Sequence, residues 1–181
     1  MSYISNGQNY TYGLKTLATI QGLTGMQSGD TAYCTDFDRI LTYDGSDWMC
    51  DDFVKLVTDS AVVQWDIVVI STAGTASQIS CQTTSTSGNG RALGVVVNST
   101  AVSAGGNVVV AFKGNWRINV RSSTANGSPL TTSTLLGKAQ ALSVASYFGV
   151  FGFATSASAA AGTISCIIIP KKELNGWVIE V

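Results

Sequence analysis

The chain has 181 residues, of which 45% are hydrophobic and 12% are charged, and its formal net charge is −1. The length suits one compact domain, or one domain with a small appendage. The charged fraction is well below the roughly 25% usual in soluble domains, and so weak a charge argues against nucleic acid or an anionic membrane as partner. A neutral surface rich in Ser, Thr, Ala and Gly instead suits docking against other proteins.

The charges are unevenly distributed along the chain. Residues 1–66 hold nine acids and three bases, a net of −6, whereas residues 67–181 hold two acids and seven bases, a net of +5. Opposite net charges in the two parts of the chain could orient neighbouring subunits head to tail, but the uneven distribution could equally be accidental.

No run of about twenty apolar residues predicts a membrane span, and the opening MSYISNGQNY lacks the regions of a signal peptide. We therefore expect synthesis in a cytoplasm. The cysteines are Cys34, Cys50, Cys81 and Cys166, with no CxxC pair and no histidine to complete a zinc site. Cys34 and Cys50 fall on strands expected to be hairpin neighbours and could touch, but a reducing compartment favours four thiols.

Residues 1–28 show no firm periodicity, which leaves two descriptions open. One is an extended arm lying on a partner, and the other is a short helix or turn around residues 14–23. Residues 29–56 are clearer: DTAYCTDF and RILTYDGSDWMCDDF predict a small β-meander, with Asp44-Gly45 as a tight turn. A meander this small must pack on something else.

Residues 57–170 predict strand after strand, with glycine-rich turns and alternation at Trp116, Ile118 and Val120. RALGVVVNSTAVSAGGNVVVAFKG (91–114) is echoed by YFGVFGFATSASAAAGTISCIIIP (147–170). The repeat matches Gly106 with Gly162, Gly94 with Gly149, and WDIVV with SPLTT. We therefore expect an all-β fold in which two similar halves close one β-barrel or sandwich, followed by a C-terminal docking segment at 171–181.

The sequence contains no catalytic arrangement, so we predict that the protein is not an enzyme and has no catalytic, cofactor-binding or metal-binding residues. The absence of histidine excludes Ser-His-Asp and Cys-His pairs. Carboxylates for acid–base chemistry or for calcium gather in the meander, but Asp belongs in turns for local hydrogen bonding and no EF-hand loop is present. They are Asp36, Asp38, Asp44, Asp47, Asp51 and Asp52.

Three short motifs are compatible either with binding or with plain packing. SGNGRALG (87–94) has glycines but neither GxGxxG nor GK[ST], so a phosphate site is not expected. Lys113, Arg117 and Arg121, interleaved with Phe112, Trp116 and Ile118, would suit single-stranded nucleic acid if they shared a face. Tyr43, Trp48 and Trp177 would suit a sugar if they were exposed.

The stretch GDTAYCTDFDRILTYDGSDWMC resembles a module of tailed-phage fibre and virion proteins, in which a G-D-x-x-Y-V-T-D strand leads to an apolar strand and a Y-D-G-x-x-W turn. The matching residues are Gly29, Asp30, Tyr33, Thr35, Asp36, Tyr43, Asp44, Gly45 and Trp48. The sequence that follows is similar to small β-domains of phage head decoration proteins and some fibre domains. It departs at Trp65, where a Gly usually precedes the Asp, so the type of turn there is left open.

The resemblance implies a non-enzymatic virion protein, made in the host cytoplasm, that decorates and stabilises the outer capsid surface as a cement protein. It further implies a homotrimer whose partner is the major capsid protein, with no cofactor, nucleic acid or membrane. One alternative is a tail fibre or receptor-binding component, although the chain has no repeat array or heptads for a shaft. Another is a carbohydrate-binding module, which would want a row of exposed aromatic residues.

Overall fold

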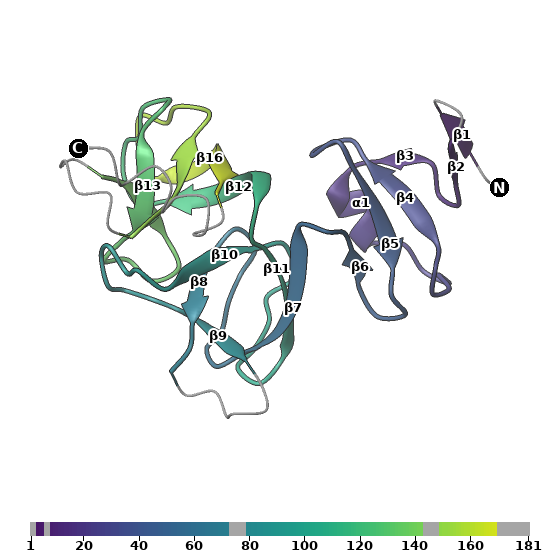
Figure 1. Ribbon diagram of the computed structural model, residues 1–181, viewed down its shortest axis with the longest axis horizontal. Helices are drawn as coiled ribbons and strands as arrows, with labels where there is room; N and C mark the ends of the chain where they lie inside the picture. The colour runs from purple at the N-terminus through teal and green to yellow at the C-terminus, as the bar shows by residue number, and fades with distance from the viewer. Residues whose placement is uncertain (1–2, 6–7, 73–78, 143–148, 170–181) are drawn as a thin grey trace. The chain divides into compact units, whose positions relative to one another are not determined.

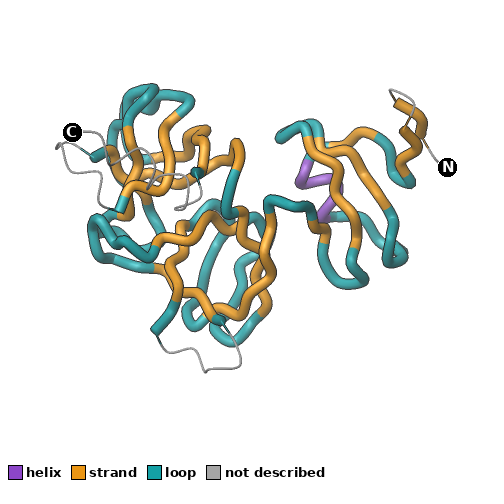
Figure 2. Tube along the Cα trace, viewed as in Figure 1, coloured by secondary structure: helices purple, strands orange, loops and turns teal. Residues whose placement is uncertain are grey.

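The computed structural model describes residues 3–5, 8–72, 79–142 and 149–169. These residues form sixteen short strands and a single five-residue helix, so the expected all-β class is confirmed (Figure 1, Figure 2). The chain divides into two compact units, Met1–Phe53 and Val54–Val181.

The first unit is built on a four-stranded sheet with the order β3-β4-β5-β6. Its strands are Leu14–Lys15 (β3), Thr31–Cys34 (β4), Arg39–Tyr43 (β5) and Trp48–Met49 (β6). The antiparallel neighbours β4, β5 and β6 are the predicted meander, and β3 adds parallel to β4. A hairpin of Tyr3–Ser5 (β1) and Gln8–Tyr10 (β2) precedes this sheet in the chain.

A short helix, α1 (Leu17–Gln21), lies in the stretch that the sequence left open between a helix and an extended arm. The Thr16 hydroxyl caps it by accepting a hydrogen bond from the Thr19 N–H (3.3 Å). Leu17 and Ile20, three positions apart, share one side of the helix and are buried. An extended arm over residues 1–28 therefore does not describe this stretch, because its apolar side chains are part of the unit's own core.

The second unit contains two closed barrels of five strands each. The first consists of Phe53–Thr58 (β7), Ile67–Ile70 (β8), Ser80–Thr83 (β9), Ala92–Val96 (β10) and Asn107–Ala111 (β11). The second consists of Gly114–Val120 (β12), Pro129–Thr132 (β13), Ala139–Ala141 (β14), Val150–Ala154 (β15) and Gly162–Ile168 (β16). The expected boundary between residues 56 and 57 therefore falls inside β7.

The two barrels have the same strand order. It is β7-β9-β8-β10-β11 around the first and β12-β14-β13-β15-β16 around the second. In each, the first strand pairs in parallel with the third, β7 with β9 and β12 with β14. The predicted repeat is confirmed, but the expectation that both halves share one barrel is wrong. Each half has five strands, enough to close a sheet on itself and remove its open edges.

The match of Gly106 with Gly162 is confirmed by strand pairing. The Gly106 carbonyl accepts a hydrogen bond from the N–H of Thr58 at the end of β7 (3.1 Å). Gly162 is paired in the same way with Val120 at the end of β12. Gly106 thus immediately precedes the last strand of its barrel and Gly162 begins the last strand of the other, and each lies opposite the end of the first strand.

The match of Gly94 with Gly149 is wrong, because the structural counterpart of Gly94 is Gly152. A Cβ on Gly94 would lie 2.0 Å from the Ala111 carbonyl oxygen, and one on Gly152 would lie 2.2 Å from the Ile167 carbonyl oxygen. Each glycine thus lets its strand approach the neighbouring strand closely. Gly149 instead precedes β15.

Each barrel has its own apolar interior. The first is centred on a buried cluster whose members are Val62, Val68, Cys81, Val96, Val108 and Val110. In the second, Trp116, Ile118 and Val120 point inward from β12 while the intervening residues are more exposed, which confirms the predicted alternation.

The turn at Trp65 keeps the form that glycine adopts in the other barrel. Trp65 has φ of 69°, and its N–H donates to the carbonyl of Val96 at the end of β10 (2.8 Å). Gly127 has φ of 81°, and its N–H donates to the carbonyl of Ala154 at the end of β15 (2.8 Å). The departure from the resemblance at Trp65 therefore changes the residue and leaves the turn unchanged.

Candidate functional site

The meander carboxylates serve as local structural groups. The Asp44 carboxylate accepts hydrogen bonds from the backbone N–H groups of Ser46 (2.8 Å) and Asp47 (2.7 Å) and so closes the turn between β5 and β6. The Asp36 carboxylate accepts one from the N–H of Leu17, at the first turn of α1 (2.9 Å). Asp38, with φ of 57°, lies in the turn between β4 and β5.

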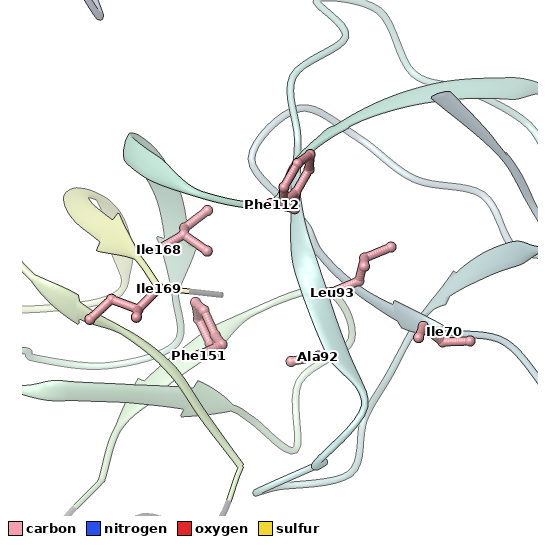
Figure 3. A pocket seen from close by; sticks show the side chains of 7 residues that line it. All are labelled: Ile70, Ala92, Leu93, Phe112, Phe151, Ile168 and Ile169. Carbon is pink, nitrogen blue, oxygen red and sulfur yellow. The ribbon is translucent and has the colours of Figure 1, made fainter. Parts of the chain in front are cut away.

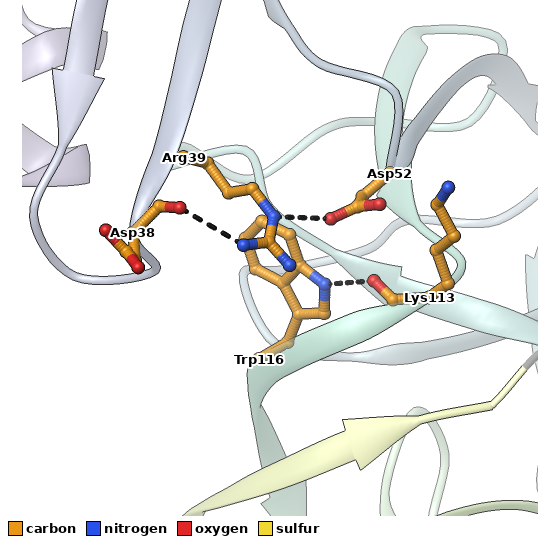
Figure 4. A network of polar contacts seen from close by, with 5 residues as sticks. All are labelled: Asp38, Arg39, Asp52, Lys113 and Trp116. Carbon is orange, nitrogen blue, oxygen red and sulfur yellow. Dashed lines mark hydrogen bonds and ion pairs between the residues drawn. The ribbon is translucent and has the colours of Figure 1, made fainter.

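Asp52 is buried and forms an ion pair with Arg39, whose Nε lies 2.8 Å from a carboxylate oxygen (Figure 4). The same guanidinium donates to the Asp38 carbonyl (3.1 Å). Asp51, beside Asp52, is exposed in a turn. Over the described part of the chain, no three His, Cys, Asp or Glu side chains are grouped so that they could hold a metal ion.

The basic and aromatic residues of β12 lie on opposite faces. Trp116 is buried inside the barrel, where its indole N–H donates to the Lys113 carbonyl (Figure 4). Arg117 is exposed on the other face. Lys113 lies over the Phe112 ring, with its ammonium 5.9 Å from the ring centroid. A stacking surface for single-stranded nucleic acid needs exposed aromatic faces next to the bases, and Trp116 does not provide one.

The aromatic residues considered for sugar binding are packed together. Trp48 is only 6% exposed, with its ring 6.0 Å from Tyr12 in an edge-on arrangement and 5.5 Å from Tyr43. These rings form part of the core of the first unit. Trp177 lies outside the described residues.

The four cysteines are unpaired in the structure. Cys34 lies on β4 and Cys50 follows β6, so β5 lies between them, and the expected hairpin neighbourhood is wrong. Burial raises the pKa of Cys50 and Cys81 to about 11 and that of Cys166 to about 12. A thiol with so high a pKa is a poor nucleophile at neutral pH.

An apolar groove lies where the two barrels meet (Figure 3). It is lined by Ile70, Ala92, Leu93, Phe112, Phe151, Ile168 and Ile169. All seven side chains are hydrocarbon, and the cavity volume is about 230 Å³. Cavities of roughly 150 Å³ with such linings bind benzene, so this one has room for a large apolar side chain.

The groove arises from equivalent irregularities in the two barrels. β10 shifts its register against β8 at Leu93, and β15 shifts against β13 at Phe151. A bulge of this kind redirects one side chain out of the normal alternation. The sequence did not predict the groove, although both positions share a pattern of an apolar residue followed by glycine, Leu93-Gly94 and Phe151-Gly152.

Polar contacts also join the two barrels, centred on the buried side chain of Asp66. Its carboxylate accepts hydrogen bonds from the Val63 N–H (3.0 Å) and the Asn119 amide (3.4 Å), and Gly137 packs directly against it. Burial raises the pKa of Asp66, and the hydrogen bonds from Val63 and Asn119 oppose that rise.

Three exposed apolar side chains flank this junction. Val63 is 49% exposed, Leu135 48% and Leu136 60%. Val63 donates its N–H to Asp66, and Gly137, next to Leu136, packs on the same carboxylate. We call Val63, Leu135 and Leu136 the junction patch, because all three are exposed apolar residues at or near groups that contact Asp66, and exposed apolar patches are typical of protein interaction surfaces.

The described residues include no helix long and apolar enough to cross a membrane. No family model and no curated protein matches the chain. Among solved structures, it is similar to the crystal structure of the N base of head fibre gp8.5 in bacteriophage phi29. The identity is 18%, the TM-score is 0.48, and the match covers 65% of this chain and 92% of that chain. A likeness at this level does not extend to function.

Proposed function

We propose that the chain is a non-enzymatic structural protein of a phage virion, and that it decorates and stabilises the outer surface of the capsid. The observation that carries this proposal is the junction patch, in which Val63, Leu135 and Leu136 are about half exposed on a weakly charged surface. The resemblance of residues 29–50 to virion modules supports the same class of protein. The acids of the meander provide no argument for catalysis, because the described ones are held in turns or in an ion pair.

In this proposal the partner is the major capsid protein, and three copies of the chain bind together at junctions between capsomers. Burial of the junction patch against the shell would contribute roughly 25 cal/mol per Å² of apolar surface. Contacts that span two capsomers strengthen the shell because pulling the capsomers apart must then expose this surface.

The test is to mix the purified chain with capsids that lack it, pellet the capsids and image them. Regular stoichiometric density on the shell, with greater resistance to heat, is the expected result. Protein that stays in the supernatant but adsorbs to host cells would support the fibre or receptor-binding alternative instead.

The junction patch is tested by Leu136→Asp, which places a charge where an apolar contact is proposed. We expect at least about a tenfold loss of capsid affinity, which corresponds to about 1.4 kcal/mol. Ile79→Asp is the matched control, because Ile79 is 67% exposed but outside the patch. Equal binding by both variants, with unchanged thermal stability, would contradict this role of the patch.

A further inference from the structure

We propose that copies of the chain associate head to tail, with an apolar sheet face in the first unit of one copy packed on an apolar face of the second barrel of the next copy. This inference deepens the proposed function, because it names the surfaces that would join the copies, and it rests on that function only for their number. The C-terminal docking segment expected at residues 171–181 lies outside the described residues and takes no part in it.

One face of the four-stranded sheet in the first unit carries a row of apolar side chains. Ala32 pairs with Leu41, and both are buried, so the side chains of the next residues along the strands, Tyr33 and Ile40, point to the opposite face. Leu14 pairs with Tyr33, and Tyr33 pairs with Ile40, which places the three side chains in line across β3, β4 and β5. Leu14 and Ile40 are exposed. We call Leu14, Tyr33 and Ile40 the first-unit face.

A second apolar row lies on the outside of the second barrel. Phe153 on β15 pairs with Ile167 on β16, and Pro129 on β13 pairs with Phe153. Ile167 is exposed, whereas Pro129 and Phe153 are half-buried. We call these three residues the second-barrel face. Asn115 on β12 pairs with Ile167, and the exposed Arg117, two residues further along β12, points to the same side and so places a positive charge beside this face.

The two faces belong to units of opposite net charge. The first unit, Met1–Phe53, holds seven acids and two bases, a net of −5, whereas residues 54–169 hold two acids and six bases, a net of +4. Four of the acids lie in the turns at the two ends of β5, beside the first-unit face: Asp36, Asp38, Asp44 and Asp47. Two copies of one face would bring like charges together, so the charges favour contact between different faces.

Contact between two different faces is heterologous, which leaves every copy with one face of each kind for its two neighbours. Such contacts close into a ring when the rotation between copies allows it, and a ring is compatible with the three copies of the proposed function. Two sheet faces pack about 10 Å apart with their side chains interdigitated. The apolar rows would thereby leave water, while the acids of one copy meet the bases of the next at the rim.

The test uses the full chain without capsids, so its outcome is separate from binding to the shell. Sedimentation equilibrium of the wild type should show association that depends on protein concentration and weakens as salt screens the charges. Ile40→Asp and Ile167→Asp should each weaken the association at least about tenfold. Ile79→Asp is the matched control, because Ile79 is exposed and belongs to neither face. A wild type that is monomeric at every concentration, or variants that associate as the control does, would overturn the proposal.

A mixture of the two variants tests whether different faces meet. Ile40→Asp keeps an intact second-barrel face and Ile167→Asp keeps an intact first-unit face, so the mixture should form a pair of one copy of each and nothing larger. Association through two copies of one face, or docking within one chain, predicts no such pair, and its absence would overturn the proposal. Thermal unfolding checks that each variant is folded, and Leu14→Asp takes the place of Ile40→Asp if the latter is not.

Discussion

Trp65 adopts a backbone conformation that the equivalent turn of the second barrel gives to glycine. Its φ of 69° lies in the left-handed region, where a side chain costs roughly 1–2 kcal/mol. Trp65 is also half-buried, so its packing offsets part of that cost. At Trp65, backbone strain and side-chain packing therefore oppose each other.

We expect Gly127→Ala to lower the free energy of unfolding by about 1 kcal/mol, because Gly127 has φ of 81°. A Cβ there would meet nothing within 4 Å, so the loss would come from the backbone alone. At Trp65 the same physics predicts that Trp65→Gly is more stable than Trp65→Ala by a similar amount. Urea denaturation measures both differences, and a Trp65→Ala variant as stable as Trp65→Gly would show that the turn had rearranged.

The raised pKa of Asp66 makes stability depend on pH in a defined direction. Between the ordinary pKa and the raised one, the folded protein binds more protons than the unfolded chain. Stability from this group is therefore greatest at low pH and falls as pH rises through the folded pKa. Compared with Asp66→Asn, the wild type should lose stability as the pH rises from the ordinary pKa of 3.8 to the raised pKa, at no more than about 1.4 kcal/mol per pH unit.

The comparison is made by urea denaturation of both proteins across this range. The difference between them isolates Asp66 from other titrating groups, because those are common to both chains. A difference that is flat with pH would contradict the raised pKa.

At the scale of elements, β10 and β15 are bulged strands that each approach a neighbour through a glycine. Gly94 and Gly152 leave no room for a Cβ against a backbone carbonyl, which cannot move aside as a side chain can. The same two strands direct Leu93 and Phe151 into the groove. The close approach and the groove are thus consequences of one local irregularity, repeated in both barrels.

We expect Gly94→Ala and Gly152→Ala each to destabilise the protein by roughly 1–3 kcal/mol, the usual cost of overpacking. Gly162→Ala is the control, since the nearest atom to its Cβ would be the Ser158 hydroxyl at an ordinary 3.8 Å. Thermal unfolding measures all three. If Gly152→Ala destabilises the protein no more than Gly162→Ala does, then β15 does not approach β16 closely.

At the scale of the whole molecule, two barrels of identical strand order form one unit, joined by hydrogen bonds between them. The Ile67 N–H in the first barrel donates to the Gly137 carbonyl in the second (2.8 Å), and the Gly88 N–H donates to the Thr132 carbonyl (3.2 Å). Cys81 and Cys166 are fully buried in the respective barrels. The accessibility of each thiol to a reagent therefore reports whether its barrel is folded.

We expect Cys81 and Cys166 to resist thiol reagents in the native protein at neutral pH, because burial raises their pKa to about 11 and about 12. Under denaturing, non-reducing conditions all four cysteines should react. The count is made with a chromogenic thiol reagent, and two thiols in place of four would prove a disulfide.

Features that depend only on neighbouring residues could be predicted from the sequence. The turn at Asp44-Gly45, the alternation at Trp116, Ile118 and Val120, and the existence of a repeat all follow from local conformation or from a period of two. The role of the meander acids in turns is likewise predictable, because a short carboxylate side chain accepts hydrogen bonds from the backbone beside it.

The pairing of the strands and their register, by contrast, could not be predicted, because they depend on contacts between distant parts of the chain. The repeat is compatible with one shared barrel or with two, and the choice depends on closure between strands far apart in the chain, such as β12 and β16. The match of Gly94 with Gly152 and the bulges at Leu93 and Phe151 are register shifts of the same non-local kind. The groove that these bulges form exists only where the two closed barrels meet, because it is lined from both and neither half contains it alone.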